Sequence, residues 1–203
     1  MPTTMSAEAA ARMKAPWEAG DFGAISRTVG IPAASAFAAW LDAGGGDEVL
    51  DVACGTGSVA VPLARRGVKV AALDISPRLL GEAKAAAMDA GVEIAFDEGQ
   101  VEDIPYTDAS FDLAVSMFGV MFSAEPVAAV SELARVLRPG GRLRLANWTP
   151  EGFSGRFPTV VGPFVPPSPL GAASPFIWGD ETSVQRMLEP HFDEIAAERI
   201  CIE

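Results

Sequence analysis

Short apolar strand patterns alternate with helical patterns between residues 47 and 147, and this alternation restricts the fold more than any other feature of the chain. The first apolar run leads into a turn with two glycines, and the strand patterns lie at 48–52, 68–73, 92–96, 111–116 and 142–145. Successive strands joined by helices form a mainly parallel sheet through right-handed crossovers. The sequence therefore predicts an α/β fold, a doubly wound sheet with helices on both faces.

Local start and stop signals divide the rest of the chain. Ser76 and Pro77 stand where a helix begins, and Gly91 stands where it ends. Another helix has apolar residues at Val127, Val130, Leu133 and Leu137 and is expected to end at Pro139-Gly140-Gly141. We expect one domain over 1–203, made of an N-terminal helical lid, a core, a Pro-rich substrate cap, and a last helix with a strand. These parts are 1–44, 47–147, 148–178 and 179–203.

The composition excludes several kinds of partner. A net charge of −12 with only three lysines opposes binding to nucleic acid or to an anionic membrane, because phosphate contacts need clusters of Lys and Arg. Cys54, Cys201 and His191 are too few for a metal cluster, so we expect no metal. No stretch has the pattern of a signal peptide or of a membrane span, which favours a cytoplasmic protein.

The turn after the first strand reads Asp51-Val-Ala-Cys-Gly55-Thr-Gly57 and can admit a ligand close to the backbone. Gly55 and Gly57 with Ala60 also fit the dinucleotide fingerprint, so the glycines alone leave the ligand open. Asp51 favours a cation over a pyrophosphate, because a carboxylate repels phosphates and attracts an ammonium or a sulfonium. Asp51 can also brace the turn through backbone hydrogen bonds, and the two roles are compatible.

Asp74 closes the second strand, seventeen residues after Gly57, where nucleotide-binding units carry an acidic residue. Its carboxylate can accept hydrogen bonds from both ribose hydroxyls, and Ile75 would then cover one face of an adenine. The alternative is that Asp74 only leads into the helix that Ser76 caps.

Four segments together resemble the motifs of class I S-adenosylmethionine-dependent methyltransferases, which have a Rossmann-like fold. They are 51–57, 73–76, 99–112 and 137–141, in the order and at the spacing of that family. Segments outside the core resemble a bacterial branch that methylates small molecules, and they are 17–22, 118–122, 147–153, 165–169 and 178–181. The resemblance covers nearly the whole chain and implies S-adenosylmethionine as the cofactor and a small molecule as the acceptor.

The resemblance also implies which residues hold the cofactor. The first turn would bind its methionine end, the residues after the second strand its ribose and adenine face, and the loop at 100–102 its adenine edge. The end of the fourth strand would contact the amino-acid portion. These residues are Asp51, Ala53, Cys54, Gly55, Thr56, Gly57, Asp74, Ile75, Gln100, Val101, Glu102 and Ser116. Gln100 replaces the usual Asp of the family and Ser58 a frequent Asn, and both changes predict weaker binding of the cofactor.

The acceptor site and the chemistry are less defined. Several aromatic residues either wall an apolar acceptor pocket, with Met121, or belong to the core: Trp17, Phe22, Phe118, Phe122 and Trp148. Methyl transfer needs mainly alignment of the acceptor with the sulfur–methyl bond. His191 lies far from the turn in sequence, Cys54 has the character of a small hydrophobe, and Glu102 and Asp103 qualify as bases only if they face the acceptor. We therefore assign no catalytic residue.

Two other functions fit parts of this pattern. One is a protein that binds S-adenosylmethionine without turnover. The other is an NAD-dependent oxidoreductase, which Asp51 and the lack of a Tyr-x-x-x-Lys arrangement disfavour. The family closes its sheet with an antiparallel hairpin, whereas this sequence ends at 201–203, within the expected sixth strand. Either the sequence is truncated or a second copy covers the exposed edge, so we expect a monomer or a homodimer.

Asp74→Ala is expected to weaken the binding of S-adenosylmethionine by about 1–3 kcal/mol, because the ribose loses its hydrogen bonds to the carboxylate. Isothermal titration of the variant and of the parent chain measures this difference. An unchanged affinity would contradict the placement of the nucleoside at Asp74.

Overall fold

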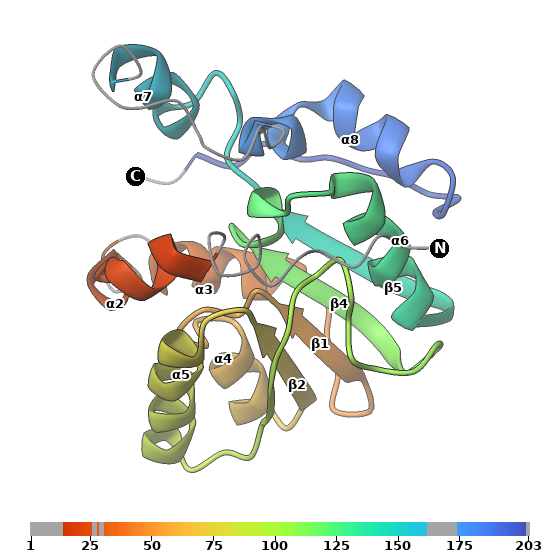
Figure 1. Cartoon of the computed structure of the whole chain (residues 1–203). Helices are drawn as coiled ribbons and strands as arrows, with labels where there is room; N and C mark the ends of the chain where they lie inside the picture. The colour runs from red at the N-terminus through yellow and green to blue at the C-terminus, as the bar shows by residue number, and fades with distance from the viewer. Residues whose placement is uncertain (1–13, 26–27, 29–30, 162–173, 202–203) are drawn as a thin grey trace. The chain divides into compact units, whose positions relative to one another are not determined.

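The structure, a computed structural model, describes residues 14–25, 28, 31–161 and 174–201 (Figure 1). Five strands form one sheet in the order β3-β2-β1-β4-β5, and the pairs β1–β2, β2–β3 and β4–β5 are parallel. Helices alternate with these strands along the chain, which confirms the predicted α/β fold. The chain divides into two compact units, 1–100 and 101–203.

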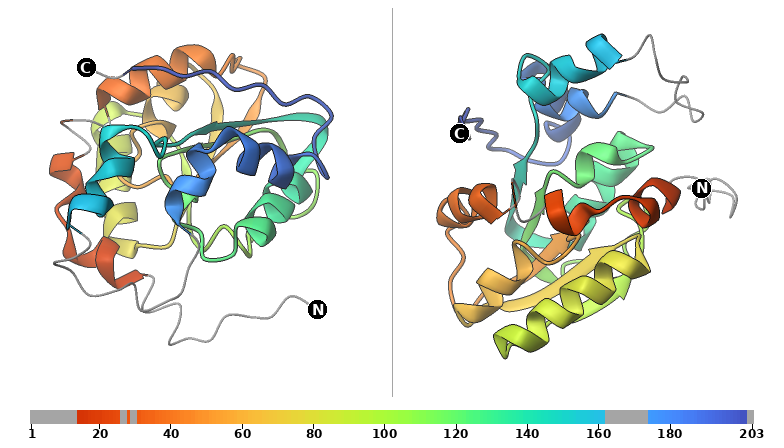
Figure 2. Two further views of the ribbon diagram at one scale, coloured as in Figure 1. Left: turned by 90° about the horizontal axis from the view of Figure 1, so that it is seen from above. Right: turned by 90° about the vertical axis from the view of Figure 1, so that its left-hand side faces the viewer.

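The first unit holds three strands and the helices that cover them. β1 (Glu48–Val52), β2 (Lys69–Asp74) and β3 (Ala95–Glu98) pair in parallel. α4 (Ala60–Arg65) and α5 (Pro77–Ala90) pack against β2, as Figure 2 shows from two further sides. Neighbouring side chains of a strand point to opposite faces of the sheet. Because Val49 and Leu50 are both fully buried, both faces of β1 are covered.

Helices of the expected lid precede β1 in the first unit. Residues 14–19 are helical, and α2 (Phe22–Ile25) and α3 (Ile31–Trp40) follow. α3 buries Ala33, Ala34 and Phe37. Residues 1–13 of the lid lie outside the described part of the chain.

α5 begins and ends as the sequence predicts. Ser76 Oγ accepts a hydrogen bond from Leu79 N at 3.1 Å, Pro77 takes the first helical position, and Gly91 follows the helix with a φ of 67°. The N–H of Val92 then donates to Ala87 O at 3.1 Å. Because this bond engages Val92 in the helix end, β3 begins later than predicted, at Ala95 rather than at residue 92.

The second unit continues the sheet pattern and adds the C-terminal helices. Its elements are β4 (Phe111–Met117), η2 (Val120–Phe122), α6 (Pro126–Val136), β5 (Leu137–Ala146), α7 (Phe153–Val161), η4 (Pro175–Gly179) and α8 (Glu181–Leu188). η4 packs against η2 and against α8, and α8 also packs against α6. Residues 162–173 of the expected cap lie outside the described part.

α6 is amphipathic and ends earlier than the sequence suggests. Its fully buried residues are Ala129, Val130, Leu133 and Val136. The predicted stop at Pro139-Gly140-Gly141 is wrong, because Leu137 already pairs with Phe111 and begins β5. The next pair in the register joins Leu113 to Arg142. Residues 138–141, which include Pro139-Gly140-Gly141, therefore form an irregularity at the start of β5.

The expected final strand does not form in the part of the chain that the structure describes. Residues 193–201 carry no strand, and all of them are exposed, so no buried ladder stabilises one there. Arg199 instead pairs with Glu181 at the start of α8, with 2.8 Å between Nε and Oε1.

Gly57→Ala should destabilise the first unit. Gly57 has a φ of 82°, and a Cβ there would lie 3.2 Å from Val61 Cγ2 and 3.3 Å from Ala83 Cβ. Backbone strain and this contact are expected to lower the free energy of unfolding by about 1–3 kcal/mol. Thermal melts measure the change.

Gly81→Ala in α5 is the matched control. A Cβ at Gly81 meets nothing within 4 Å. Alanine is favoured over glycine in a helix by roughly 0.5–1 kcal/mol. The two melting temperatures should therefore move in opposite directions, and a Gly57→Ala variant as stable as the parent would contradict the strained geometry of the turn.

Candidate functional site

The turn after β1 holds its backbone in an uncommon conformation. Ala53, Gly55 and Gly57 all have positive φ, at 54°, 56° and 82°. This conformation costs an alanine roughly 1–2 kcal/mol, and such strain is concentrated at ligand sites. A Cβ built on Gly55 meets nothing within 4 Å, so the backbone there is open to an approaching group.

Asp51 lies in β1 with 1% of its surface exposed. Its Oδ2 accepts a hydrogen bond from Ala60 N at 3.0 Å, which confirms that it braces the turn against the start of α4. Burial raises the pKa of Asp51 to about 8; the hydrogen bond from Ala60 opposes this shift and the Asp74 carboxylate adds to it. A bound cation would favour the ionised carboxylate, so the predicted cation role is chemically compatible with the bracing role.

Asp74 ends β2 and joins the turn to the start of α5. Its Oδ2 accepts a hydrogen bond from Gly55 N at 2.7 Å, and its Oδ1 accepts one from Ser76 N at 2.9 Å. Burial raises the pKa of Asp74, while its backbone hydrogen bonds act in the opposite direction. The helix-entry role is therefore confirmed. A carboxylate has about four acceptor sites, so lone pairs remain for ribose hydroxyls, and that role stays a prediction.

Several other predicted cofactor residues belong to the first unit. Gly99 N donates to Asp74 O at 3.0 Å, which brings the half-buried Gln100 close to the end of β2. Thr56 and Ile75 are also half-buried. Cys54 is buried, and burial raises the pKa of its thiol well above the usual value. A thiol held protonated in this way is no nucleophile, as the sequence predicts.

A contact that the sequence does not reveal fastens residues 17–20 to the start of α5. Glu18 accepts hydrogen bonds from Ser76 Oγ at 2.5 Å and from Arg78 N at 3.5 Å. Arg78 Nη2 donates to Trp17 O at 2.8 Å and to Gly20 O at 2.5 Å. The bonded residues are 58 to 61 positions apart, so no local spacing could have indicated them.

Two of the predicted acceptor residues meet in this fastened segment. The ring centroids of Trp17 and Phe22 are 4.9 Å apart, and both side chains are half-buried. Ser76 connects the segment to Asp74, because it donates its N–H to Asp74 and its hydroxyl to Glu18. Trp17, the neighbour of Glu18 in the chain, is thus linked through Ser76 to the carboxylate that is expected to bind the ribose.

In the second unit, a stacked aromatic pair stands at the ends of β4 and β5. Phe118 follows β4 with a positive φ of 59°, and its ring stacks on Trp148 with 4.0 Å between centroids and 6° between planes. Ser116 is fully buried, and its Oγ accepts a hydrogen bond from Val120 N at 3.1 Å. Phe122 is 44% exposed, whereas Met121 is buried and belongs to the core.

The candidate bases of the second unit have structural partners. Glu102 Oε1 accepts hydrogen bonds from Ala124 N at 2.7 Å and from Glu125 N at 3.3 Å, just before α6. Asp103 is exposed, and Val101 is buried. His191 is exposed, with its Nε2 3.4 Å from Ser131 Oγ. Glu102 therefore stabilises the entry to α6, and His191 lies at the surface.

Two general features of the described residues bear on the possible ligands. Among them, no group of three His, Cys, Asp or Glu side chains could hold a metal ion. None of their helices combines the length and the apolar character needed to cross a membrane.

Comparisons with known proteins identify relatives of the chain. Residues 50–145 match the family described as "Methyltransferase domain". An uncharacterized protein of Mycobacterium bovis is 36% identical over 198 residues, which are 98% of this chain and 72% of the relative. A demethylmenaquinone methyltransferase of Beutenbergia cavernae is 40% identical over 114 residues, or 55% of this chain and 46% of that enzyme.

A solved structure extends the similarity to the fold. The crystal structure of a putative methyltransferase from Bacillus halodurans matches with a TM-score of 0.64 and 29% identity. The match covers 78% of this chain and 67% of that one. The two chains therefore share a fold, which agrees with the α/β sheet described above.

Asp51→Asn should change how stability depends on pH. A carboxyl group ionises near pH 4 in an unfolded chain, whereas the pKa of Asp51 is raised to about 8 in the fold. Between these two values the folded chain binds one proton more than the unfolded chain. The free energy of unfolding therefore falls as the pH rises through that window. In the ligand-free protein, Asp51→Asn should raise the free energy of unfolding at pH 8 by roughly 1–3 kcal/mol and have little effect at pH 4.

Melts of the parent and the variant between pH 4 and pH 8 measure this difference. Asp89→Asn, on the exposed side of α5, is the control and should leave the pH dependence unchanged. Parallel curves for the parent and Asp51→Asn would show that Asp51 is already ionised in the folded protein.

Proposed function

This chain belongs to the S-adenosylmethionine-dependent methyltransferases, and we propose that it transfers the methyl group of that cofactor to a small-molecule acceptor by in-line displacement. The observation that carries the proposal is the open glycine turn with the buried Asp51 beside it. Bound S-adenosylmethionine supplies a methyl group on a positively charged sulfur, so the acceptor needs alignment more than activation.

The residues of the first unit suit the cationic and nucleoside parts of this cofactor. Gly55 leaves open space at its backbone, Asp51 can supply a negative charge that a bound cation stabilises, and Asp74 keeps acceptor sites for ribose hydroxyls. We assign the methionine end to 53–57, the ribose to Asp74 and one adenine face to Ile75. The adenine edge is assigned to 100–102, and the amino-acid portion also to Ser116.

Positional catalysis is favoured over general-base catalysis by the partners of the titratable groups. Burial keeps the Cys54 thiol protonated, Glu102 Oε1 already accepts two backbone hydrogen bonds, and His191 is exposed. A hydroxyl acceptor usually needs a base, whereas a thiolate, a carbanion or an amine does not. We therefore propose that the acceptor atom belongs to a thiolate, a carbanion or an amine.

The aromatic residues support an apolar acceptor with a flat ring. Phe118 and Trp148 stack on each other with 4.0 Å between ring centroids, so an acceptor ring would meet only the outer face of one of them, and the exposed Phe122 follows in the same stretch of chain. Aromatic faces attract cations, so such residues also suit the neighbourhood of a sulfonium. The similarity to a demethylmenaquinone methyltransferase supports a small molecule as the acceptor, although the match covers 46% of that enzyme.

A turnover assay tests this function. The chain is incubated with S-adenosylmethionine and a panel of apolar thiols, amines and activated ring carbons, and mass spectrometry follows S-adenosylhomocysteine and methylated products. We expect both to accumulate with at least one acceptor, and to form more slowly with Asp74→Ala at the same, sub-saturating cofactor concentration.

Isothermal titration with S-adenosylmethionine, S-adenosylhomocysteine and NAD separates the alternatives. Binding of the first two without turnover on any acceptor would favour an inactive binding protein. Binding of NAD alone would favour an oxidoreductase and would contradict the proposal.

A further inference from the structure

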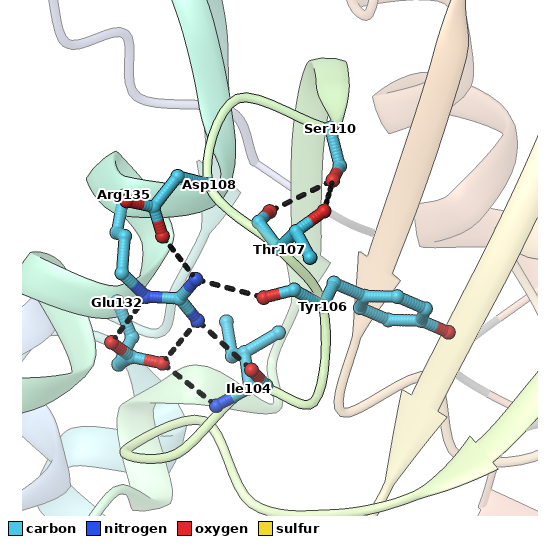
Figure 3. Close-up of polar contacts among 7 residues, drawn as sticks. All are labelled: Ile104, Tyr106, Thr107, Asp108, Ser110, Glu132 and Arg135. Atoms are coloured by element: carbon cyan, nitrogen blue, oxygen red, sulfur yellow. Dashed lines mark hydrogen bonds and ion pairs between the residues drawn. The ribbon is translucent and has the colours of Figure 1, made fainter.

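α6 holds the loop between residues 101 and 110 from both of its ends. At its start, Glu102 Oε1 accepts hydrogen bonds from Ala124 N and Glu125 N. Near its end, Glu132 and Arg135 bind the part of the loop that begins at Ile104 (Figure 3). The loop is therefore held to this helix at Glu102 and at Ile104, so Asp103 lies between the two fixed points and Val101 directly precedes the first.

Arg135 uses its whole side chain in this contact. A guanidinium has five N–H donors, and each has an acceptor here. Nε donates to Glu132 Oε1 at 2.7 Å, and Nη2 donates to Glu132 Oε2 at 2.7 Å and to Ile104 O at 2.9 Å. Nη1 donates to Tyr106 O at 2.8 Å and to Asp108 Oδ1 at 2.9 Å. A lysine has a single nitrogen and could not reproduce this set.

Both backbone polar groups of Ile104 are hydrogen-bonded to side chains of α6. Its N–H donates to Glu132 Oε2 at 2.9 Å, and its carbonyl accepts from Arg135. Its side chain is buried, with 2% of the residue exposed. The hydrogen bond from Arg135 lowers the pKa of Glu132, so the two side chains remain a charged pair near neutral pH. The position of Ile104 is thus set by α6, two residues after Glu102.

The C-terminal end of the loop is hydrogen-bonded separately to the main chain of α6. Ala109 N donates to Arg135 O at 3.0 Å, and Ser110 N donates to Val136 O at 2.9 Å. These bonds use the main chain of α6, so they survive substitution of the Arg135 side chain. Loss of the guanidinium should therefore release residues 104–108 without detaching β4.

We propose that Arg135 is a positioning residue for recognition of the nucleobase. With Glu132 it fixes Ile104, and through Ile104 it sets the position of Val101 and Glu102, to which the adenine edge is assigned. This inference rests on the proposed function. It predicts that Arg135 governs the preference for adenine over other bases, whereas the methionine end, assigned to 53–57, is unaffected.

The test compares two ligands that differ in the base. S-adenosylhomocysteine carries adenine, and S-inosylhomocysteine carries hypoxanthine, which lacks the exocyclic amino group. Isothermal titration gives the dissociation constant of each for the parent, Arg135→Lys and Arg138→Lys. Arg138 is the matched control, because its Nη1 pairs with Asp112 Oδ2 at 2.8 Å and the pair lies outside residues 101–108.

The parent is expected to prefer the adenine ligand roughly tenfold, the size of one net hydrogen bond. Arg135→Lys should weaken binding of the adenine ligand by about tenfold and change binding of the hypoxanthine ligand little, so the preference disappears. Arg138→Lys should keep the preference. In turnover, KM for S-adenosylmethionine should rise in Arg135→Lys while kcat stays within about twofold of the parent, since the chemical step is not touched.

Equal weakening of both ligands in Arg135→Lys, or an unchanged preference, would overturn the inference and leave Arg135 a structural residue. If the parent binds neither ligand, the proposed function itself fails. Glu132→Gln serves as the second variant, because it keeps the shape of Glu132 and removes its charge. It should reduce the preference in the same direction, and a preserved preference in a folded Glu132→Gln variant also contradicts the inference.

Discussion

The carboxylate of Asp74 carries the interaction on which the candidate site depends. One of its oxygens binds Gly55 N, in the turn after β1, and the other binds Ser76 N, where α5 begins. The two connections that follow β1 and β2 are thereby held in one geometry. Ser76 passes this constraint on to Glu18, and Gly99 attaches to the main chain of Asp74, so the segments before and after also take their positions from this residue.

The electrostatics of the site explain why a cation suits it. Asp51 and Asp74 are both buried, with 1% and 5% of their surfaces exposed, and burial raises the pKa of each carboxyl group. Buried carboxylates lose the hydration that stabilises their charge, and a nearby positive group restores part of that stabilisation. The ammonium and sulfonium of S-adenosylmethionine can supply it, whereas a pyrophosphate would add negative charge beside two acidic groups.

Much of the fold can be predicted from local sequence signals, and the wrongly predicted strand start also has a local cause. The ends of α5 are predictable because Ser76, Pro77 and Gly91 each have a fixed place in helix capping. The start of β3 is not, because the hydrogen bond of Val92 to the end of α5 competes with the strand. The spacing of Asp74 predicts it as a candidate site residue, but it does not predict the bonds of Asp74 to Gly55 and Ser76. Contacts between distant residues, such as those of Arg135 with Ile104 and of Glu18 with Ser76, leave no periodic pattern in the sequence.

Crystals soaked with S-adenosylhomocysteine and, separately, with NAD test whether the turn after β1 receives the charged amino-acid end of the cofactor. We expect density for the homocysteine part along 53–57, with its ammonium group on the side of Asp51, and no density for NAD. A pyrophosphate bound across Gly55 would contradict it, because two phosphates would then lie against the acidic pair.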